Sequence, residues 1–370
     1  MTTNQIYTIV NSIASQAYGS SILTVVDNQG LVSLGTTVLS SSTNTEAFLD
    51  TLAQRIGKTI MDYRRYRNKL AGMVLDDFEY GAILQKIKVA MPTSEADESY
   101  GLVDGNTVDH YKIAKPVAIQ KLFVTRTPYQ FHITVQEEHL REAFLSPEAM
   151  GGFIGAVFGE VRNAVEIALE ALGRNAIANY IAEVDGTSRT IDLVTEWNSL
   201  GLTTLTAATA LFDDDFIRYA IRRINETFDM MQSMTELFND GTVERFTPLE
   251  DMRVKMLSTF NRAAQTVTQY AAFHEELVSV DHDFEILPFW QASQTPGSIL
   301  VERASDGTST GVDNIIAIIH DRDALGMYKR DERIVTTPIN AAGLYYNQYW
   351  HLKQLWFNDL SENFVVFTLN

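Results

Sequence analysis

The longest regular pattern in the sequence is helical and runs from about Ser146 to Val184. Apolar residues recur through it with the 3.6-residue period of an α-helix. Ser146, Pro147 and Glu148 supply an N-cap, a first-turn proline and a first-turn acid. We predict a helix over 147–184, roughly 55 Å long at 1.5 Å per residue. Gly155 and Gly159 leave one of its sides bare, so a second backbone can approach there.

Two strand-like segments, 82–91 and 113–124, alternate apolar and polar residues. About 20 polar residues connect them, which is long for a compact domain that makes no use of the connection. We therefore predict an extended β-hairpin loop that projects as an arm. The lysines of this region are interpreted as ordinary strand-face charges, and they are Lys86, Lys88, Lys112 and Lys115.

The rest of the chain mixes helices and strands, which predicts an α+β fold. The Ser- and Thr-rich segment 33–45 is expected to be an extended arm, followed by a helix from about Thr43 to Leu70. Further helices are predicted over 213–238 and 259–272, and strands over 22–26, 254–257, 277–290, 314–320, 321–337, 344–357 and 363–369.

Composition excludes several classes of protein. The 370 residues include no cysteine, so disulfides, a thiolate nucleophile and cysteine-based metal sites are excluded. Lys and Arg number 29 against 47 Asp and Glu, and a net charge of −18 argues against a dedicated nucleic-acid reader. We find no apolar run long enough to span a membrane and no signal peptide at the N-terminus, so we expect a soluble intracellular protein.

Few residues suggest chemistry. Strand alternation would place Asp281, Asp283 and Glu285 on one face, where three carboxylates could bind Ca²⁺, but a solvated strand face is the simpler explanation. The glycine-rich segment 151–159 lies inside the predicted helix, so it is not a phosphate-binding turn. No nucleophile or phosphate-binding motif is present. We expect no enzymatic activity and no cofactor, which favours a structural role.

The order of these elements resembles the Hong Kong 97-type fold of tailed-phage major capsid proteins and encapsulins. The resemblance depends on the extended loop, the long helix and the closing segment, where ALGMYKRDERIVTTP (324–338) precedes the strands around Tyr345–Trp356 and NFVVFTL (363–369). It implies five parts: an N-terminal arm and helix (1–80), an extended loop (81–135), a first peripheral segment with the spine helix (136–199), an axial α/β domain (200–335) and C-terminal peripheral strands (336–370).

The resemblance implies a major capsid protein that self-assembles into an icosahedral or prolate shell around phage DNA. Its partners would be copies of itself in hexamers and pentamers, a portal, packaged double-stranded DNA held non-specifically and possible decoration proteins, with no membrane. Because the sequence begins at Met1, a scaffold would be a separate protein. The protein would reside in the virion after assembly in the host bacterial cytoplasm. The alternatives are an encapsulin-type shell, a tail or baseplate component and, more remotely, a metal-dependent hydrolase that uses 281–285.

Two charged segments of opposite sign suggest how copies contact each other. Residues 93–111 carry five acids and no Lys or Arg, namely Glu95, Asp97, Glu98, Asp104 and Asp109. Residues 55–69 carry six bases and one acid, and helical spacing aligns Arg55, Lys58, Arg65 and Lys69. We predict that the loop of one subunit docks near this basic stripe of another. A solvated helix face and a stripe that touches DNA phosphates are the alternatives.

Overall fold

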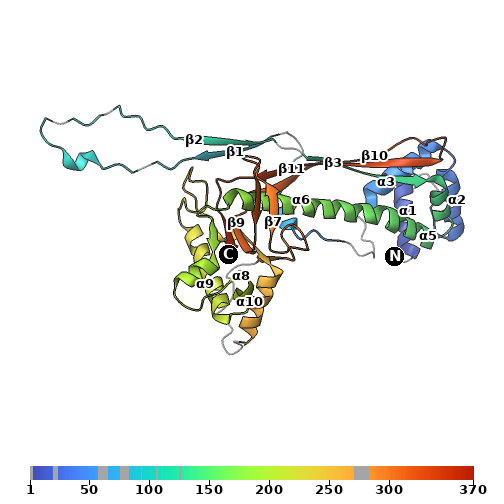
Figure 1. Ribbon diagram of the computed structural model, residues 1–370. Helices are drawn as coiled ribbons and strands as arrows, with labels where there is room; N and C mark the ends of the chain where they lie inside the picture. The colour runs from blue at the N-terminus through green and yellow to red at the C-terminus, as the bar shows by residue number, and fades with distance from the viewer. Residues whose placement is uncertain are drawn as a thin grey trace. The chain divides into compact units, whose positions relative to one another are not determined.

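The computed structural model describes residues 3–19, 24–56, 66–75, 83–92, 94–105, 107–109, 111–124, 127–270 and 284–370. The chain divides into two compact units. Unit 1 comprises residues 1–80, 126–173 and 327–355, and unit 2 comprises 81–125, 174–326 and 356–370. Figure 1 labels elements of both units where there is room.

Unit 2 is built around a five-stranded mixed sheet with the order β4-β12-β9-β5-β6. Its strands are β4 (Thr190–Asp192), β5 (Met252–Leu257), β6 (Phe284–Leu287), β9 (Ile315–Asp321) and β12 (Phe364–Thr368). Every residue of β12 and all but the last of β9 are buried. Continuous apolar strands of this kind are typical of a sheet covered on both faces. The predictions of a buried strand near 314–320 and of a last strand over 363–369 are confirmed.

Helices α7 (Leu193–Ser199), α9 (Asp214–Gln232) and α10 (Ser258–Tyr270) contribute to the core of unit 2. The α9 helix begins as predicted, because the Asp213 side chain accepts a hydrogen bond from the Phe216 amide at 2.9 Å. Its apolar face buries Phe216, Ile224 and Phe228 in that core. Unit 2 also contains the short helix α8 (Ala207–Ala210), the 3₁₀ turn Leu249–Asp251 and the hairpin β7–β8 (Ile299–Glu302 and Ser309–Val312).

Unit 1 contains the three-stranded sheet β10-β11-β3 and the N-terminal helices. The strands are β3 (Thr127–Gln136), β10 (Leu325–Thr336) and β11 (Tyr345–Asn358), and the helices are α1 (Thr3–Tyr18), α2 (Asn28–Val38), α3 (Ser42–Ile56) and α4 (Glu137–Ala143). A 3₁₀ turn covers Ala71–Met73. Tyr346 and Trp350 on one face of β11 join the helices in the core of the unit, together with Val135 of β3.

The predicted long helix is present as one helical run with an irregular turn near its start. It consists of α5 (Pro147–Phe153), the π-helical turn Ile154–Gly159 and α6 (Glu160–Val184). Ser146 caps the run by accepting the Ala149 amide at 3.1 Å, and Gly186 just beyond it has a φ of +70°. Gly155 is buried, whereas a Cβ placed on Gly159 would meet no described atom within 4 Å.

The expectation of an extended arm over 33–45 is wrong, because α2 and the start of α3 occupy this segment. Leu31, Leu34 and Val38 recur at helical spacing and are buried. The Ser and Thr hydroxyls of α2 donate hydrogen bonds to backbone carbonyls one turn earlier in the helix. For example, the Thr37 hydroxyl donates to the Ser33 carbonyl at 3.1 Å. A helix can therefore accommodate these polar residues. The strand expected over 22–26 falls partly on 20–23, outside the described residues, and 24–26 form no strand.

The closing strand lies inside the sheet of unit 2, where β12 is placed between β4 and β9. Its apolar side chains explain this position, since Val365 and Phe367 are fully buried in the core that contains α9. The assignment of 336–370 to a peripheral domain stays a prediction.

Candidate functional site: the extended hairpin and its anchor

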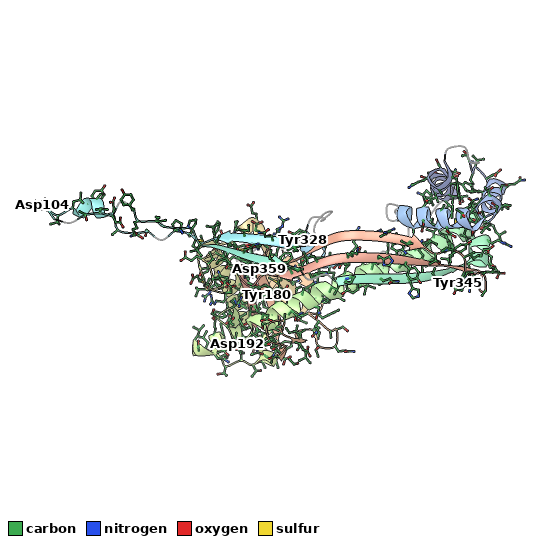
Figure 2. All side chains as sticks on the ribbon, turned by 90° about the horizontal axis from the view of Figure 1, so that it is seen from above. Asp104, Tyr180, Asp192, Tyr328, Tyr345 and Asp359 are labelled. Atoms are coloured by element: carbon green, nitrogen blue, oxygen red, sulfur yellow. The ribbon has the colours of Figure 1, made fainter. Side chains whose placement is uncertain are left out.

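The predicted hairpin loop is confirmed. Strand β1 (Leu84–Val89) pairs antiparallel with β2 (Ala118–Phe123), from Leu84 opposite Phe123 to Val89 opposite Ala118. The connecting residues extend away from the sheet of unit 2, and a short 3₁₀ helix, Glu98–Gly101, lies near their far end (Figure 1). Asp104 marks that end in Figure 2, and Asp359 lies at the base of the hairpin.

The loop exposes far more apolar surface than a solvated connection needs. All side chains described between Met91 and Ala118 are exposed. Tyr100 and Tyr111 are 92% and 88% exposed, and Leu102, Val103, Ile113 and Val117 are all more than 60% exposed. Contiguous exposed apolar surface of this kind marks an interaction site in a soluble protein.

The base of the hairpin is held by a partly buried group of ion pairs, which we call the anchor. It consists of four basic residues, Lys86, Lys88, Lys121 and Arg245, and three acidic residues, Asp240, Asp359 and Glu362.

Asp359 is the centre of the anchor. Its carboxylate oxygens lie 3.1 Å from Lys86 Nζ, 3.2 Å from Lys88 Nζ and 3.1 Å from Lys121 Nζ. Glu362 adds a second acid, 2.6 Å from Lys86 Nζ and 2.9 Å from Lys88 Nζ. The side chain of Asp359 is 0% exposed and that of Lys88 is 3% exposed. The pairs that Lys88 makes are therefore shielded from water, unlike ordinary surface charges.

Strand geometry brings these groups together. Lys86 and Lys88 are two residues apart in β1 and therefore point to the same face, and Lys121 lies directly opposite Lys86 in β2. Two of the acids, Asp359 and Glu362, come from the turn between β11 and β12, where the Ser361 amide and hydroxyl donate to Asp359 Oδ1 at 3.1 and 2.6 Å.

The buried Tyr180 of α6 holds the same turn. Its hydroxyl donates to the Asp359 carbonyl at 2.9 Å, and its ring stacks on Phe364 with centroids 3.8 Å apart. Helix, turn and hairpin are thus joined at one point of unit 2, where Figure 2 labels Tyr180 and Asp359 close together.

The charges of the anchor favour the ionised acids. Burial alone would raise the pKa of Asp359, but the Ser361 hydrogen bond and the charges of Lys86 and Lys88 outweigh it and hold that pKa well below its usual range. The pKa of Glu362 is likewise lowered against the effect of burial, chiefly by Lys86. Burial opposes the charge of Lys86, yet Glu362 and Asp359 raise its pKa above the ordinary value. Asp359 and Glu362 are therefore ionised beside a charged Lys86 at neutral pH.

The predicted acidic residues lie on the exposed loop. Asp97 accepts the Ser99 amide at 2.9 Å, Asp109 accepts the Tyr111 amide at 2.9 Å, and Glu95 pairs with Lys112. Asp104 is exposed, and Glu98 opens the 3₁₀ helix, although its side chain lies outside the described set. All five remain predicted contact residues.

Most of the predicted basic stripe lies outside the described residues. This holds for Lys58, Arg65 and the side chain of Arg55, while Lys69 is exposed and its backbone amide donates to Glu170 at 3.2 Å. The stripe therefore stays a prediction.

The proposed calcium ligands are not brought together by the described structure. Asp281 and Asp283 lie outside the described residues, and Glu285 instead pairs at 2.5 Å with Lys255, which is buried in the neighbouring strand β5. Among the described residues no group of three metal-ligating side chains could hold an ion. No helix in that part of the chain is both long and apolar enough to cross a bilayer.

Sequence reasoning missed the anchor, because Lys86 and Lys88 were interpreted as ordinary strand-face charges. Lys88 is buried and Lys86 half-buried against a turn more than 270 residues away in the sequence. The sequence signal was the alternation of Lys86 and Lys88 in one hairpin strand with Lys121 in the other, within a chain of net charge −18.

Comparison with solved structures places the fold among phage capsids. The chain is similar to the capsid structure of Staphylococcus phage Andhra, with a TM-score of 0.55, 11% identity and coverage of 85% of this chain and 87% of that one. It is equally similar, at a TM-score of 0.55 and 10% identity, to a chain in the structure of the head fiber and inner core protein of native bacteriophage P68, with the same coverage. The fold is thus the Hong Kong 97 type that the sequence suggested.

Sequence comparison then identifies the family. Residues 8–368 match the Phi29-like phage major capsid protein family, and the chain belongs to it. It is 21% identical over 366 residues to the major capsid protein of Bacillus phage B103, covering 98% of this chain and 72% of that protein. The protein forms capsid shells, has a structural role and resides in the virion. Of the alternatives raised by the sequence, family membership selects the phage capsid over an encapsulin or a tail component.

Proposed function

We propose that the extended loop is the arm by which each capsid subunit holds a neighbouring subunit, and that the anchor fixes the direction of this arm. The observation that carries the proposal is the exposed apolar surface of the loop. Tyr100 and Tyr111 are almost fully solvated in the single chain, and a second copy would bury them.

The anchor supports the same proposal, because a contact between subunits has to be made at a defined position. Ion pairs shielded from water hold the hairpin base in one geometry. The loop then meets a neighbour with less conformational entropy left to lose than an unanchored loop would have.

The wider assignment follows the family. The sheet of unit 2 serves as the axial domain and the sheet of unit 1, with the long helix, as the peripheral domain. Copies form hexamers and pentamers in the host bacterial cytoplasm, with a separate scaffolding protein, a portal and decoration proteins as candidate partners. Packaged DNA is held by non-specific contacts, and the protein performs no catalysis.

Deleting 93–111 tests the role of the loop. The hairpin and the anchor lie outside the deletion, so we expect a soluble, folded protomer that no longer forms stable shells. Circular dichroism and thermal melting check the fold, and electron microscopy checks assembly. A matched variant keeps the loop length but replaces Tyr100, Leu102 and Tyr111 by Ser, and it should show the same defect. Normal shells from both variants would refute the proposal.

A further inference from the structure

The paired base of the extended hairpin has two faces of opposite character. The face toward the anchor carries Lys86, Lys88 and Lys121. The opposite face, which we call the outward face, consists of three directly opposed pairs of exposed residues. They are Gln85 with Leu122, Ile87 with Gln120, and Val89 with Ala118.

The outward face is apolar and uncharged. Ile87, Val89 and Leu122 are between 53% and 61% exposed, and Ile83 and Val124, which continue the same alternation beyond the ladder, are about half exposed. Antiparallel strands with one solvated face normally turn their apolar side chains inward and their polar side chains outward. This hairpin does the reverse, because its lysines point inward. An exposed apolar face on paired strands is a site for pairing with another protein surface.

The charge of the chain indicates which partner covers this face. The protein forms capsid shells, so many copies meet one another. In a chain of net charge −18 most surfaces repel the same surface of another copy, whereas none of the six residues of the outward face is charged. A surface that meets its own copy makes an isologous contact about a two-fold axis. Two uncharged strand pairs can stack in this way, as the sheets of a sandwich do.

We infer that the outward face of the β1–β2 hairpin packs against the outward face of a second copy of this chain, about a local two-fold axis of the shell. This contact is separate from the one proposed for loop residues 93–111 and does not depend on it. Six paired residues in two strands cover roughly 20 Å by 10 Å. Two such faces bury far less than the roughly 1,200 Å² of a stable interface. The contact therefore forms within shells, where other contacts align the copies, and not between free protomers.

Single introduced cysteines test the contact directly, because the chain contains no cysteine and any disulfide must join the same residue of two copies. Gln85→Cys, Ile87→Cys and Gln120→Cys are made separately, and shells are either mildly oxidised or treated with a short bis-maleimide. We expect a crosslinked dimer on a denaturing gel from at least one variant. The matched control is Leu300→Cys, an exposed position in the β7–β8 hairpin, which should stay monomeric.

Two results of the cysteine experiment would overturn the inference. One is the absence of dimer from all three variants in intact shells. The other is equal crosslinking of dispersed protomers, because that would report random collision and not a contact made in the shell.

Charge substitution tests self-pairing without depending on crosslink geometry. Gln85→Glu with Gln120→Glu puts acids on both opposed faces, and Gln85→Lys with Gln120→Lys puts bases there. Each double variant alone should yield about tenfold fewer shells, because like charges then repel at every such contact. A mixture of the two chains should restore shells, since acidic and basic faces can pair. Gln29→Glu and Gln29→Lys, at an exposed position of α2, are the controls and should assemble normally. Circular dichroism and thermal melting verify that every protomer is folded.

The mixture separates self-pairing from its alternatives. Normal shells from the lysine variant and defective shells from the glutamate variant would show that the face meets a different, acidic surface, which refutes self-pairing. Normal shells from both variants would also refute it and would leave the outward face to a separate protein. If the 93–111 deletion is defective in either case, the proposed function of the loop stands. If the deletion forms normal shells while the charge variants behave as expected, the loop proposal fails and the outward-face contact stands.

Discussion

Replacing the central acid of the anchor, Asp359→Asn, should release the extended hairpin without unfolding the protomer. The substitution keeps the shape of the side chain, and the new amide oxygen can still accept the Ser361 hydrogen bonds. The anchor would then hold four basic residues against Glu362 and Asp240 alone.

The expected cost follows from the partners that remain. Breaking a buried ion pair by removing one partner costs about 3–5 kcal/mol. Lys88 keeps Glu362 and Lys121 keeps Asp240, so the lower end of that range applies, about 3 kcal/mol. At 1.4 kcal/mol per factor of ten, the hairpin should open roughly 100-fold more often.

Amide hydrogen exchange measures this opening, with the amides of β1 and β2 as reporters and those of β9 as an internal reference. The matched control is Glu95→Gln, which removes the exposed pair with Lys112 and should change stability by no more than about 1 kcal/mol. If exchange in β1 and β2 of Asp359→Asn rises by less than about fivefold, or about 1 kcal/mol, the anchor does not hold the hairpin.

Three further predictions concern the same chain. The pKa values of Asp359 and Glu362 are lowered in the folded protein. The stability that these ionised acids contribute is therefore complete above about pH 4, their pKa in the unfolded chain, and is lost as pH falls through their folded pKa values. Below about pH 4 the melting temperature should thus fall less steeply in Asp359→Asn than in the parent protein. Tyr180→Phe should lower the free energy of unfolding by about 1–2 kcal/mol, because the Asp359 carbonyl loses its donor while the stacking on Phe364 remains, and an unchanged denaturant midpoint would contradict this. Gly159→Ala should leave the stability of the protomer unchanged or raise it by under about 1 kcal/mol, because the new Cβ would contact no described atom. Gly35→Ala should melt at a lower temperature, because its new Cβ would lie 2.5 Å from the Cβ of Phe144. A defect of Gly159→Ala in shells alone would indicate a close neighbour there, as the bare helix side predicts.

Local patterns explain what the sequence could predict. The long helix and the hairpin strands follow from periodicity, and the caps at Ser146 and Asp213 follow from residue type, because each of these involves neighbours along the chain. Composition misled where it conflicted with periodicity, as in α2, whose Ser and Thr residues suggested a loose arm although Leu31, Leu34 and Val38 form a buried stripe.

Contacts between distant segments could not be predicted from one sequence. The burial of Lys88 depends on Asp359 and Glu362, and the pairing of Lys255 with Glu285 depends on two parallel strands being neighbours. No spacing rule connects such residues. The same limit applied to β12, whose apolar pattern identified a strand but not its neighbours in the sheet.

The position of β12 has a consequence for when newly made chains become competent to assemble. Its parallel partner β4 is synthesised about 180 residues earlier, so at 5–20 residues per second β4 waits roughly 10–35 s before the strand beside it exists. Until then β9 also lacks its neighbour on that side, and the centre of the sheet is open. Ribosome-bound chains and products of interrupted translation therefore lack a finished unit 2. Chains that end before residue 364 lack β12 and leave β4 and β9 without the strand that joins them in this sheet.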